Sequence, residues 1–142
     1  MENVYITSAL RTAVGSLGKS LKNSHAYELG STVISSVLKD SGISGKEIDE
    51  IIMGQVLTSG SGQNPARQAA IKSGVPIEKP AYIVNQVCGS GIRSISSGYQ
   101  SIKSGDSKIV IAGGQENMSL APHSIHLRDG KKLGNVELTD TM

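Results

Sequence analysis

Short apolar segments alternate with longer amphipathic segments along most of the chain. Residues 4–10, 50–57, 81–87 and 108–112 are rich in apolar and β-prone side chains and predict four strands. The last of these is continuously apolar, which is typical of a strand buried on both faces. Apolar positions at helical spacing predict three helices, from residue 25 to about 41, from 65 to about 73, and from Cys88 to Gly105.

Residues typical of helix ends support these boundaries. Asn23 or Ser24 is a suitable N-cap for the first helix, and Asn64 followed by Pro65 is a strong start for the second. Segment 44–47, Ser-Gly-Lys-Glu, has the spacing of a capping box and predicts a short helical turn. A glycine follows each of the three helices: Gly42, Gly74 and Gly105.

The order of these elements, strand and helix in strict alternation (βαβαβαβ), predicts an α/β fold. Such alternation favours a mostly parallel sheet, with right-handed crossovers and helices on both faces. Residues 115–142 depart from the pattern, because they are polar and have no clear period. A long structureless segment on a compact domain is unusual, so it is either a functional loop or a stretch whose partner elements lie outside this chain.

Composition narrows the class of protein. A chain of 142 residues fits one domain, and its net charge of +2 with 37% hydrophobic residues disfavours disorder. Because Phe and Trp are absent and the charges nearly balance, we expect no nucleic-acid partner. A single cysteine excludes an internal disulfide and a thiolate zinc site. We see neither a signal peptide in the segment that begins at Met1 nor an apolar run of membrane-spanning length, so we expect a cytoplasmic protein without a membrane partner.

Cys88 is the first candidate for chemistry. It ends a predicted strand and begins a predicted helix, and ligands of parallel sheets bind outside the carboxyl ends of the strands. At a helix N-terminus, unpaired N–H groups and the helix dipole favour the nucleophilic thiolate form of a cysteine. Gly89 and Gly91 allow a sharp turn and the close approach of a substrate. A small buried cysteine that only fills space at the strand end is an equally open reading of its position.

Two glycine-rich loops are weaker candidates. Residues 89–94 begin like the dinucleotide-binding pattern G-x-G-x-x-G, but Ser94 stands where the pattern requires its last glycine. Residues 60–67 precede a capped helix and suit either an anion or tight packing against another chain. The simpler interpretation of 60–67, a flexible start to the helix, is favoured.

The remaining candidates are histidines and basic residues near the C-terminus. His123 and His126 lie close in sequence to Arg128, Lys131 and Lys132. A metal site needs more ligands than this pair provides, so we expect no bound metal. A basic loop facing an anionic ligand is possible chemistry, but a solvated loop fits the composition better. His25 opens a helix and is expected at the surface.

Several motifs together resemble the thiolase family. The heptapeptide around Cys88, residues 85–91 (NQVCGSG), is similar to the family's nucleophile motif. The resemblance extends in order along nearly the whole chain and is most like the bacterial biosynthetic group, the acetyl-CoA C-acetyltransferases. The other matching segments are 11–15 (RTAVG), 62–68 (GQNPARQ), 112–119 (AGGQENMS), 121–123 (APH) and 126–128 (HLR).

The resemblance implies an acyltransferase. Thiolases move an acyl group between coenzyme A and an acceptor through a covalent thioester, and Cys88 matches the acyl-carrying nucleophile. Its main-chain N–H would be an oxyanion donor. Acetyl-CoA would be the substrate, condensed to acetoacetyl-CoA or regenerated by thiolysis, with no tightly bound cofactor. Family members form dimers or tetramers, so a homo-oligomer is expected.

The chain also departs from the family pattern. It has neither the family's Gly-His-Pro motif, which carries the catalytic histidine, nor its second cysteine in Cys-x-Gly. The resemblance therefore places an incomplete N-terminal domain core at 1–119 and the start of a loop region at 120–142, with the C-terminal domain absent. We expect this chain to be inactive alone and to self-associate. The alternative is a non-catalytic thiolase remnant or assembly module.

Overall fold

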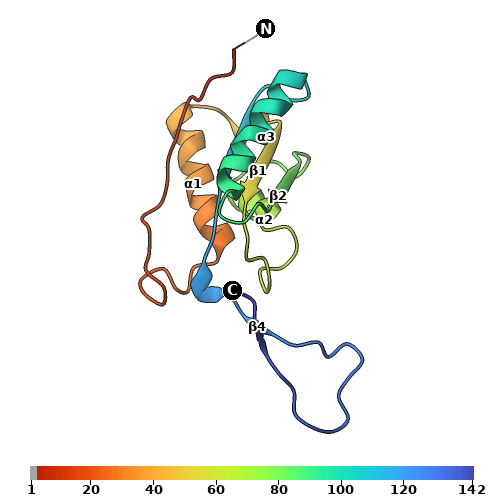
Figure 1. Ribbon diagram of the computed structural model, residues 1–142. Coiled ribbons are helices and arrows are strands. Elements are labelled where there is room, and N and C mark those ends of the chain that lie inside the picture. The colour runs from red at the N-terminus through yellow and green to blue at the C-terminus, as the bar shows by residue number, and fades with distance from the viewer. Residues whose placement is uncertain (1–2) are drawn as a thin grey trace.

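Three parallel strands form the sheet of this protein. The computed structural model describes residues 3–142, in which β1 (Glu50–Gly54) lies between β2 (Ala81–Val84) and β3 (Val110–Gly114) (Figure 1). In the register, Ile51 lies beside Ala81 on one side and Ile111 on the other. The expected α/β class with a parallel sheet is therefore confirmed.

Helices cover both faces of the sheet, as predicted. Helices α1 (Ala26–Ser41) and α2 (Pro65–Lys72) pack against each other on one face, and α3 (Ser90–Ser104) packs on the other (Figure 1). The main apolar core lies between the sheet and the α1–α2 pair, because alternate residues of β1 point to that side. Its buried members are Ile34, Ile48, Ile51, Met53, Ala66, Ala69, Ala70 and Val75.

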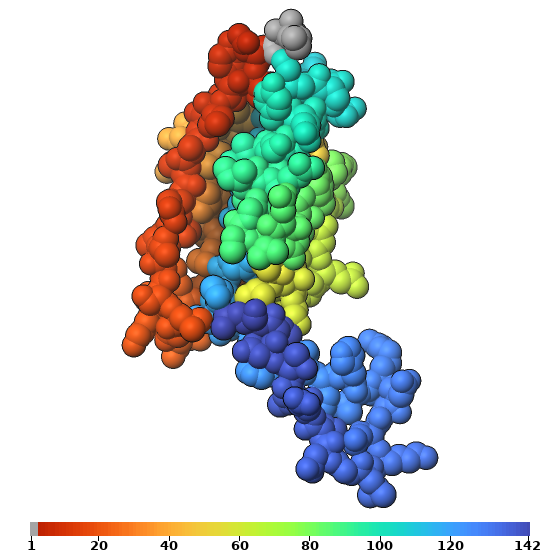
Figure 2. Space-filling view, viewed as in Figure 1, coloured from red at the N-terminus to blue at the C-terminus, as the bar shows by residue number. Residues whose placement is uncertain are grey.

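Helix α3 contacts the sheet through small residues rather than large ones. Its buried positions are Ser90, Ser94 and Gly98. The apolar positions that predict the helix instead lie on its outer side, where Ile92 is 75% exposed and Tyr99 is 53% exposed. Figure 2 shows α3 at the front surface of the molecule. The periodicity thus located the helix correctly, but it marks the face turned away from this sheet.

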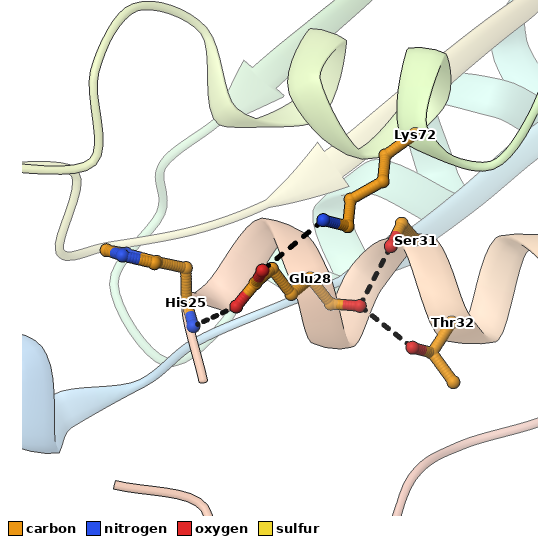
Figure 3. Close-up of polar contacts among 5 residues, drawn as sticks. All are labelled: His25, Glu28, Ser31, Thr32 and Lys72. Carbon is orange, nitrogen blue, oxygen red and sulfur yellow. Dashed lines mark hydrogen bonds and ion pairs between the residues drawn. The ribbon is translucent and has the colours of Figure 1, made fainter. Parts of the chain in front are cut away.

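A polar cluster joins the first turn of α1 to α2 (Figure 3). The Glu28 carboxylate accepts the main-chain N–H of His25 at 3.0 Å and pairs with the Lys72 ammonium at 3.3 Å. These contacts, the His25 N–H first, hold the pKa of Glu28 below its ordinary value. The Ser31 and Thr32 hydroxyls donate to the Glu28 carbonyl, each at 2.9 Å.

The predicted N-caps of α1, Asn23 and Ser24, are wrong. The cap residue is His25, which is exposed, as expected for this histidine. The physical reason lies outside the helix: the Asn117 amide donates to the carbonyls of Leu21 and Ser24 and so holds the preceding loop. The other helix-end signals are confirmed, including Asn64 as the cap of α2 and the helical turn η1 (Gly45–Glu47).

Two of the predicted strands differ from the structure. Residues 4–10 form no strand but run extended along the outside of α1, and Tyr5 is 74% exposed (Figure 1). A strand needs a partner for its backbone hydrogen bonds, and β1, β2 and β3 pair only with one another within the described residues. Strand β3 is only half-buried instead of buried on both faces, because it lies at the edge of the sheet.

Residues 121–142 form an arm that projects from the domain (Figures 1 and 2). It follows a short 3₁₀ turn, η2 (Met118–Leu120), and contains a small antiparallel pair, β4 (His123–Ser124) and β5 (Thr139–Asp140). No helix among residues 3–142 is long and apolar enough to cross a membrane. Met1 and Glu2, on which the argument against a signal peptide partly rests, lie outside the described residues.

The close packing of β1 on α3 predicts the effect of a methyl group at Gly54. A Cβ there would lie 2.5 Å from the Ser90 carbonyl carbon and 2.7 Å from the Gly91 nitrogen, both backbone atoms. Gly54→Ala should therefore lower the free energy of unfolding by about 2 kcal/mol or more in urea denaturation. Gly91→Ala is the matched control, since a Cβ at Gly91 has open space. Equal stability of the two variants would contradict this packing.

The Asp49 carboxylate, at the amino end of the sheet, predicts a pH-dependent contribution to stability. It accepts the main-chain N–H groups of Lys108 at 2.7 Å and Ile109 at 3.0 Å, and these bonds hold its pKa below the ordinary value of 3.8. A lowered pKa in the folded state gives stability that is present above 3.8 and lost as the pH falls through the folded value.

Asp49→Asn should therefore lower the unfolding free energy by about 1 kcal/mol at neutral pH. The difference from the unmodified protein should shrink as the pH falls below 3.8, when both are followed by urea denaturation. Asp129→Asn, on the exposed arm, controls for the loss of a surface carboxylate and should leave stability unchanged. A difference that stays constant into the acid range would show that Asp49 acts without its charge.

Candidate active site

Cys88 lies where the sequence places it, between the carboxyl end of β2 and the first turn of α3. Its side chain is exposed and carries a free thiol. Exposure favours the nucleophile over the alternative of a buried, space-filling cysteine, because a nucleophile must be reached by its substrate. Among residues 3–142, no hydrogen bond joins the thiol to a histidine or to any other group.

The turn that carries Cys88 has a strained residue immediately before it. Val87 has φ +50°, in the left-handed region that β-branched residues rarely adopt. The Gly89 N–H donates to the Gln86 carbonyl at 3.0 Å, and the Ser90 N–H donates to the Val87 carbonyl at 3.1 Å. The chain therefore reverses tightly from strand to helix and leaves the thiol at the surface of the turn.

The buried side chain of Ser90 stabilises this turn through two hydrogen bonds. Its buried hydroxyl accepts the Gln86 N–H at 2.8 Å and donates to the Val87 carbonyl at 2.6 Å. One side chain thus satisfies backbone groups on both sides of the strained residue. The sequence does not indicate this function, because Ser90 is there only a small residue in a glycine-rich segment.

Close contact with the sheet places the start of α3. Gly54 lies directly against the backbone of Ser90 and Gly91, and the fully buried Ser94 hydroxyl lies 2.6 Å from the Gly113 carbonyl. Ser94 is the residue that breaks the dinucleotide-binding pattern. Here its hydroxyl joins α3 to β3, which explains a small polar residue at that position.

Residues 115–117, which follow β3, hold the neighbouring loops. The Glu116 carboxylate accepts the N–H groups of Val56 at 2.8 Å and Leu57 at 3.2 Å. The Gln115 amide donates to the Gln55 side chain at 2.8 Å, and both glutamines are buried. The sequence identified this motif as part of the resemblance but indicated no contacts for it. The one feature of the sequence that could have predicted these contacts is the position of the motif directly after a strand, at the same edge of the sheet as Cys88.

The glycine-rich loop at residues 60–67 is held by its own helix. The Gln68 amide donates to the carbonyls of Ser61 and Gln63, and the Asn64 side chain accepts the Arg67 N–H while donating to the Ala81 carbonyl. These contacts favour the interpretation of residues 60–67 as the start of a helix rather than as an anion site. The Arg67 guanidinium donates to main-chain carbonyls of the loop before β2.

The histidine pair lies in and just after β4, not in this turn. His123 and His126 are exposed on the arm, and Lys131 and Lys132 are exposed beyond them. Within residues 3–142, no group of three histidine, cysteine or acidic side chains is arranged to hold a metal ion. In the described part of the chain, these residues therefore form no metal-binding group with Cys88.

Comparison with known proteins decides the family. The model of the thiolase N-terminal domain matches residues 4–142. This chain belongs to the thiolase family. The resemblance found in the separate motifs is thereby confirmed over essentially the whole chain, and the thiolase-like architecture expected from it agrees with the observed fold.

Individual thiolases are similar to this chain at high identity. The acetyl-CoA acetyltransferase of Rhizobium meliloti (strain 1021) is 52% identical over 99% of this chain and 36% of its own length. The cytosolic acetyl-CoA acetyltransferase of Rattus norvegicus is 48% identical over 98% of this chain and 35% of its own. This thiolase chain thus spans about a third of the length of these relatives.

A solved thiolase has the same fold. The Bacillus anthracis acetyl-CoA acetyltransferase superposes with a TM-score of 0.90 and is 36% identical, covering 96% of this chain and 35% of that one. The relatives' names describe acetyl transfer from acetyl-CoA by enzymes about three times as long as this chain.

The hydrogen bonds of Ser90 predict a specific cost of removing its hydroxyl. Ser90→Ala leaves the Gln86 N–H and the Val87 carbonyl without this partner, so the unfolding free energy should fall by about 1–2 kcal/mol. Ser97→Ala, farther along the same helix, should be neutral or slightly stabilising because alanine favours helices. Urea denaturation of both variants checks this, and equal stabilities would show that Ser90 does not hold the turn.

Proposed function

We propose that Cys88 is the acyl-accepting nucleophile of a thiolase-type acetyl-CoA C-acetyltransferase. The sulfur attacks the thioester carbonyl carbon of acetyl-CoA, the bond from that carbon to the coenzyme A sulfur breaks, and the coenzyme A thiolate leaves and takes up a proton. A second acetyl-CoA loses an α proton, and the carbanion attacks the acetyl carbon of acetyl-Cys88. The new C–C bond forms as the C–S bond to Cys88 breaks, which releases acetoacetyl-CoA and a Cys88 thiolate that takes up a proton. In the reverse sense, free coenzyme A attacks an acyl-Cys88.

One observation carries this proposal: an exposed thiol on a tight strand-to-helix turn, at the carboxyl edge of a parallel sheet, in a chain of the thiolase family. That edge is where ligands of parallel sheets bind. The start of α3 supplies a positive dipole end beside the thiol. The relatives' names support acetyl-CoA as the substrate. Coenzyme A is proposed as the other product, and no tightly bound cofactor is part of the proposal.

The main-chain N–H of Cys88 is proposed as a donor to the oxyanion that forms during attack. A donor held by the fold costs no reorganisation when the negative charge develops. The turn provides such rigidity, because the hydrogen bonds of Gly89 and Ser90 fix the backbone on the helical side of Cys88. The proposal therefore gives Cys88 two functions, one for its sulfur and one for its nitrogen.

We further propose that these 142 residues do not turn over alone. The three histidines are His25, His123 and His126, and none lies in the family's Gly-His-Pro motif. Within residues 3–142, none is hydrogen-bonded to Cys88. Cys88 is also the only cysteine, so the second family cysteine has no counterpart here. Removing one member of a catalytic set commonly costs several powers of ten in rate.

A non-catalytic assembly module is the second candidate function. The observation that favours it is the exposed apolar side of α3, where Ile92 and Tyr99 lie bare. Such patches mark interaction surfaces, and they support the proposal that the chain forms homo-oligomers.

For either candidate function, residues 1–119 are proposed as the domain core and 120–142 as the start of a loop region. A cytoplasmic location is proposed, in line with the name of the rat relative.

Acetylation of Cys88 tests the proposed function directly. After incubation with acetyl-CoA, intact-mass measurement should show one added acetyl group, which free coenzyme A removes. Cys88→Ser is the control and should show none, because the protein has a single cysteine. The expected rate is slow, since the reaction proceeds without a general base.

The opposite result separates the two candidates. If no acetyl group is added while a small alkylating reagent still modifies Cys88, the thiol is exposed but unassisted. The assembly module would then be the better description of this chain. The alkylation control also excludes prior oxidation of the thiol as the cause of a negative result.

A further inference from the structure

We propose that Glu116 is a positioning residue for Cys88. Its carboxylate holds the backbone of Val56 and Leu57, and Asn85 transmits this constraint to the turn that carries the thiol. The inference rests on the proposed function of Cys88. It assigns a purpose to a residue of the 112–119 motif that the acyl-transfer chemistry does not otherwise use.

The first step is the contact between Glu116 and the loop after β1. Glu116 lies two residues beyond β3 and is half-buried. Its Oε2 accepts the Val56 N–H at 2.8 Å, and Oε1 accepts the Leu57 N–H at 3.2 Å. Hydrogen bonds from backbone N–H groups to a carboxylate are stronger than neutral ones. Glu116 therefore fixes this loop, which leaves β1 beside the carboxyl end of β2.

The second step is made by one amide side chain. The Asn85 Nδ2 group lies 3.4 Å from the Val56 carbonyl as a donor, and the Asn85 Oδ1 atom accepts the Val87 N–H at 3.0 Å. The same peptide region that Glu116 holds therefore also orients the Asn85 side chain. The chain of contacts runs from Glu116 through Val56 and Asn85 to Val87, the residue before the nucleophile.

Val87 is the residue that needs external support. A valine at φ +50° costs free energy and persists only where its surroundings hold it. Ser90 holds the turn from the helical side, by its bonds to the Gln86 N–H and the Val87 carbonyl. Asn85 holds the Val87 N–H from the strand side, so the strained residue is fixed at both its donor and its acceptor.

The neighbouring Gln115 does not share this function. Its amide donates to Gln55, whose own amide donates to the Leu57 carbonyl, so Gln115 reaches the same loop only indirectly and makes no bond to Val56. Its Oε1 atom is buried against Gly30 of α1. Asn117 bonds to the loop before α1. Within residues 115–117, Glu116 is thus the one whose side chain bonds directly to Val56, the residue to which Asn85 donates.

Amide hydrogen exchange tests the coupling without any activity. In Glu116→Gln, the Val56 and Leu57 amides lose their carboxylate acceptor, and the Val87 amide should also exchange roughly fivefold faster. Asp49→Asn is the matched control. It removes a carboxylate that likewise accepts two backbone N–H groups, but at the opposite end of the sheet. It should leave the exchange of the Val87 amide unchanged.

A second variant isolates the link. Asn85→Asp keeps an acceptor for the Val87 N–H but loses the donor to the Val56 carbonyl. Faster Val87 exchange in this variant, and no further increase in the double variant with Glu116→Gln, would show that both act through one chain of contacts. Unchanged Val87 exchange in both single variants overturns the proposal. If Glu116→Gln does not fold, the Asn85→Asp result alone decides it in the same way.

Acetyl transfer to Cys88 from acetyl-CoA supplies the functional readout. The rate should fall about tenfold in Glu116→Gln and stay within about twofold in Asp49→Asn, although both lose stability. A wild-type chain that accepts no acetyl group contradicts the proposed function but leaves the exchange result standing. An acetylated wild type whose rate Glu116→Gln leaves unchanged overturns the positioning function alone.

Discussion

The close contact between α3 and the sheet is the constraint on which the site depends. Gly54 has no side chain, and the backbone of Ser90 and Gly91 lies where its Cβ would be. Ser94 and Gly98 continue this stripe of small residues along the helix. Because the helix lies so near the strands, its first turn starts directly at the carboxyl edge of the sheet. The thiol of Cys88 is therefore presented at that edge rather than above it.

Such close packing has a consequence for the rest of α3. A helix that buries serine and glycine against its sheet gains little from the hydrophobic effect on that side. Its large side chains, Ile92, Ile95 and Tyr99, lie on the exposed side. The apolar core of this domain lies instead on the other face of the sheet, between it and α1 and α2. Helix α3 thus combines an exposed thiol just before its first residue with an exposed apolar surface along its length.

Polar side chains, rather than apolar contacts, join the loops around the thiol. Glu116 and Asn85 tie the ends of β1 and β2 together, Ser90 closes the turn, and Asn117 fastens the loop before α1. Each satisfies backbone N–H or carbonyl groups that irregular chain leaves unpaired. This explains why a thiolase-family motif rich in amide and acidic residues lies at the same edge of the sheet as Cys88.

Local patterns in the sequence determined most elements of this protein. The alternation of apolar segments, the Asn64–Pro65 helix start and the glycines after each helix identified three helices, three strands and the position of Cys88, because these signals act over a few residues. Only the tertiary structure decided the rest. Residues 4–10 have strand-like composition but no partner, the outward face of α3 depends on what packs beneath it, and the Glu116–Val56 contact joins residues 60 positions apart. Pairing, burial and long-range hydrogen bonds depend on neighbours in space, which no local pattern specifies.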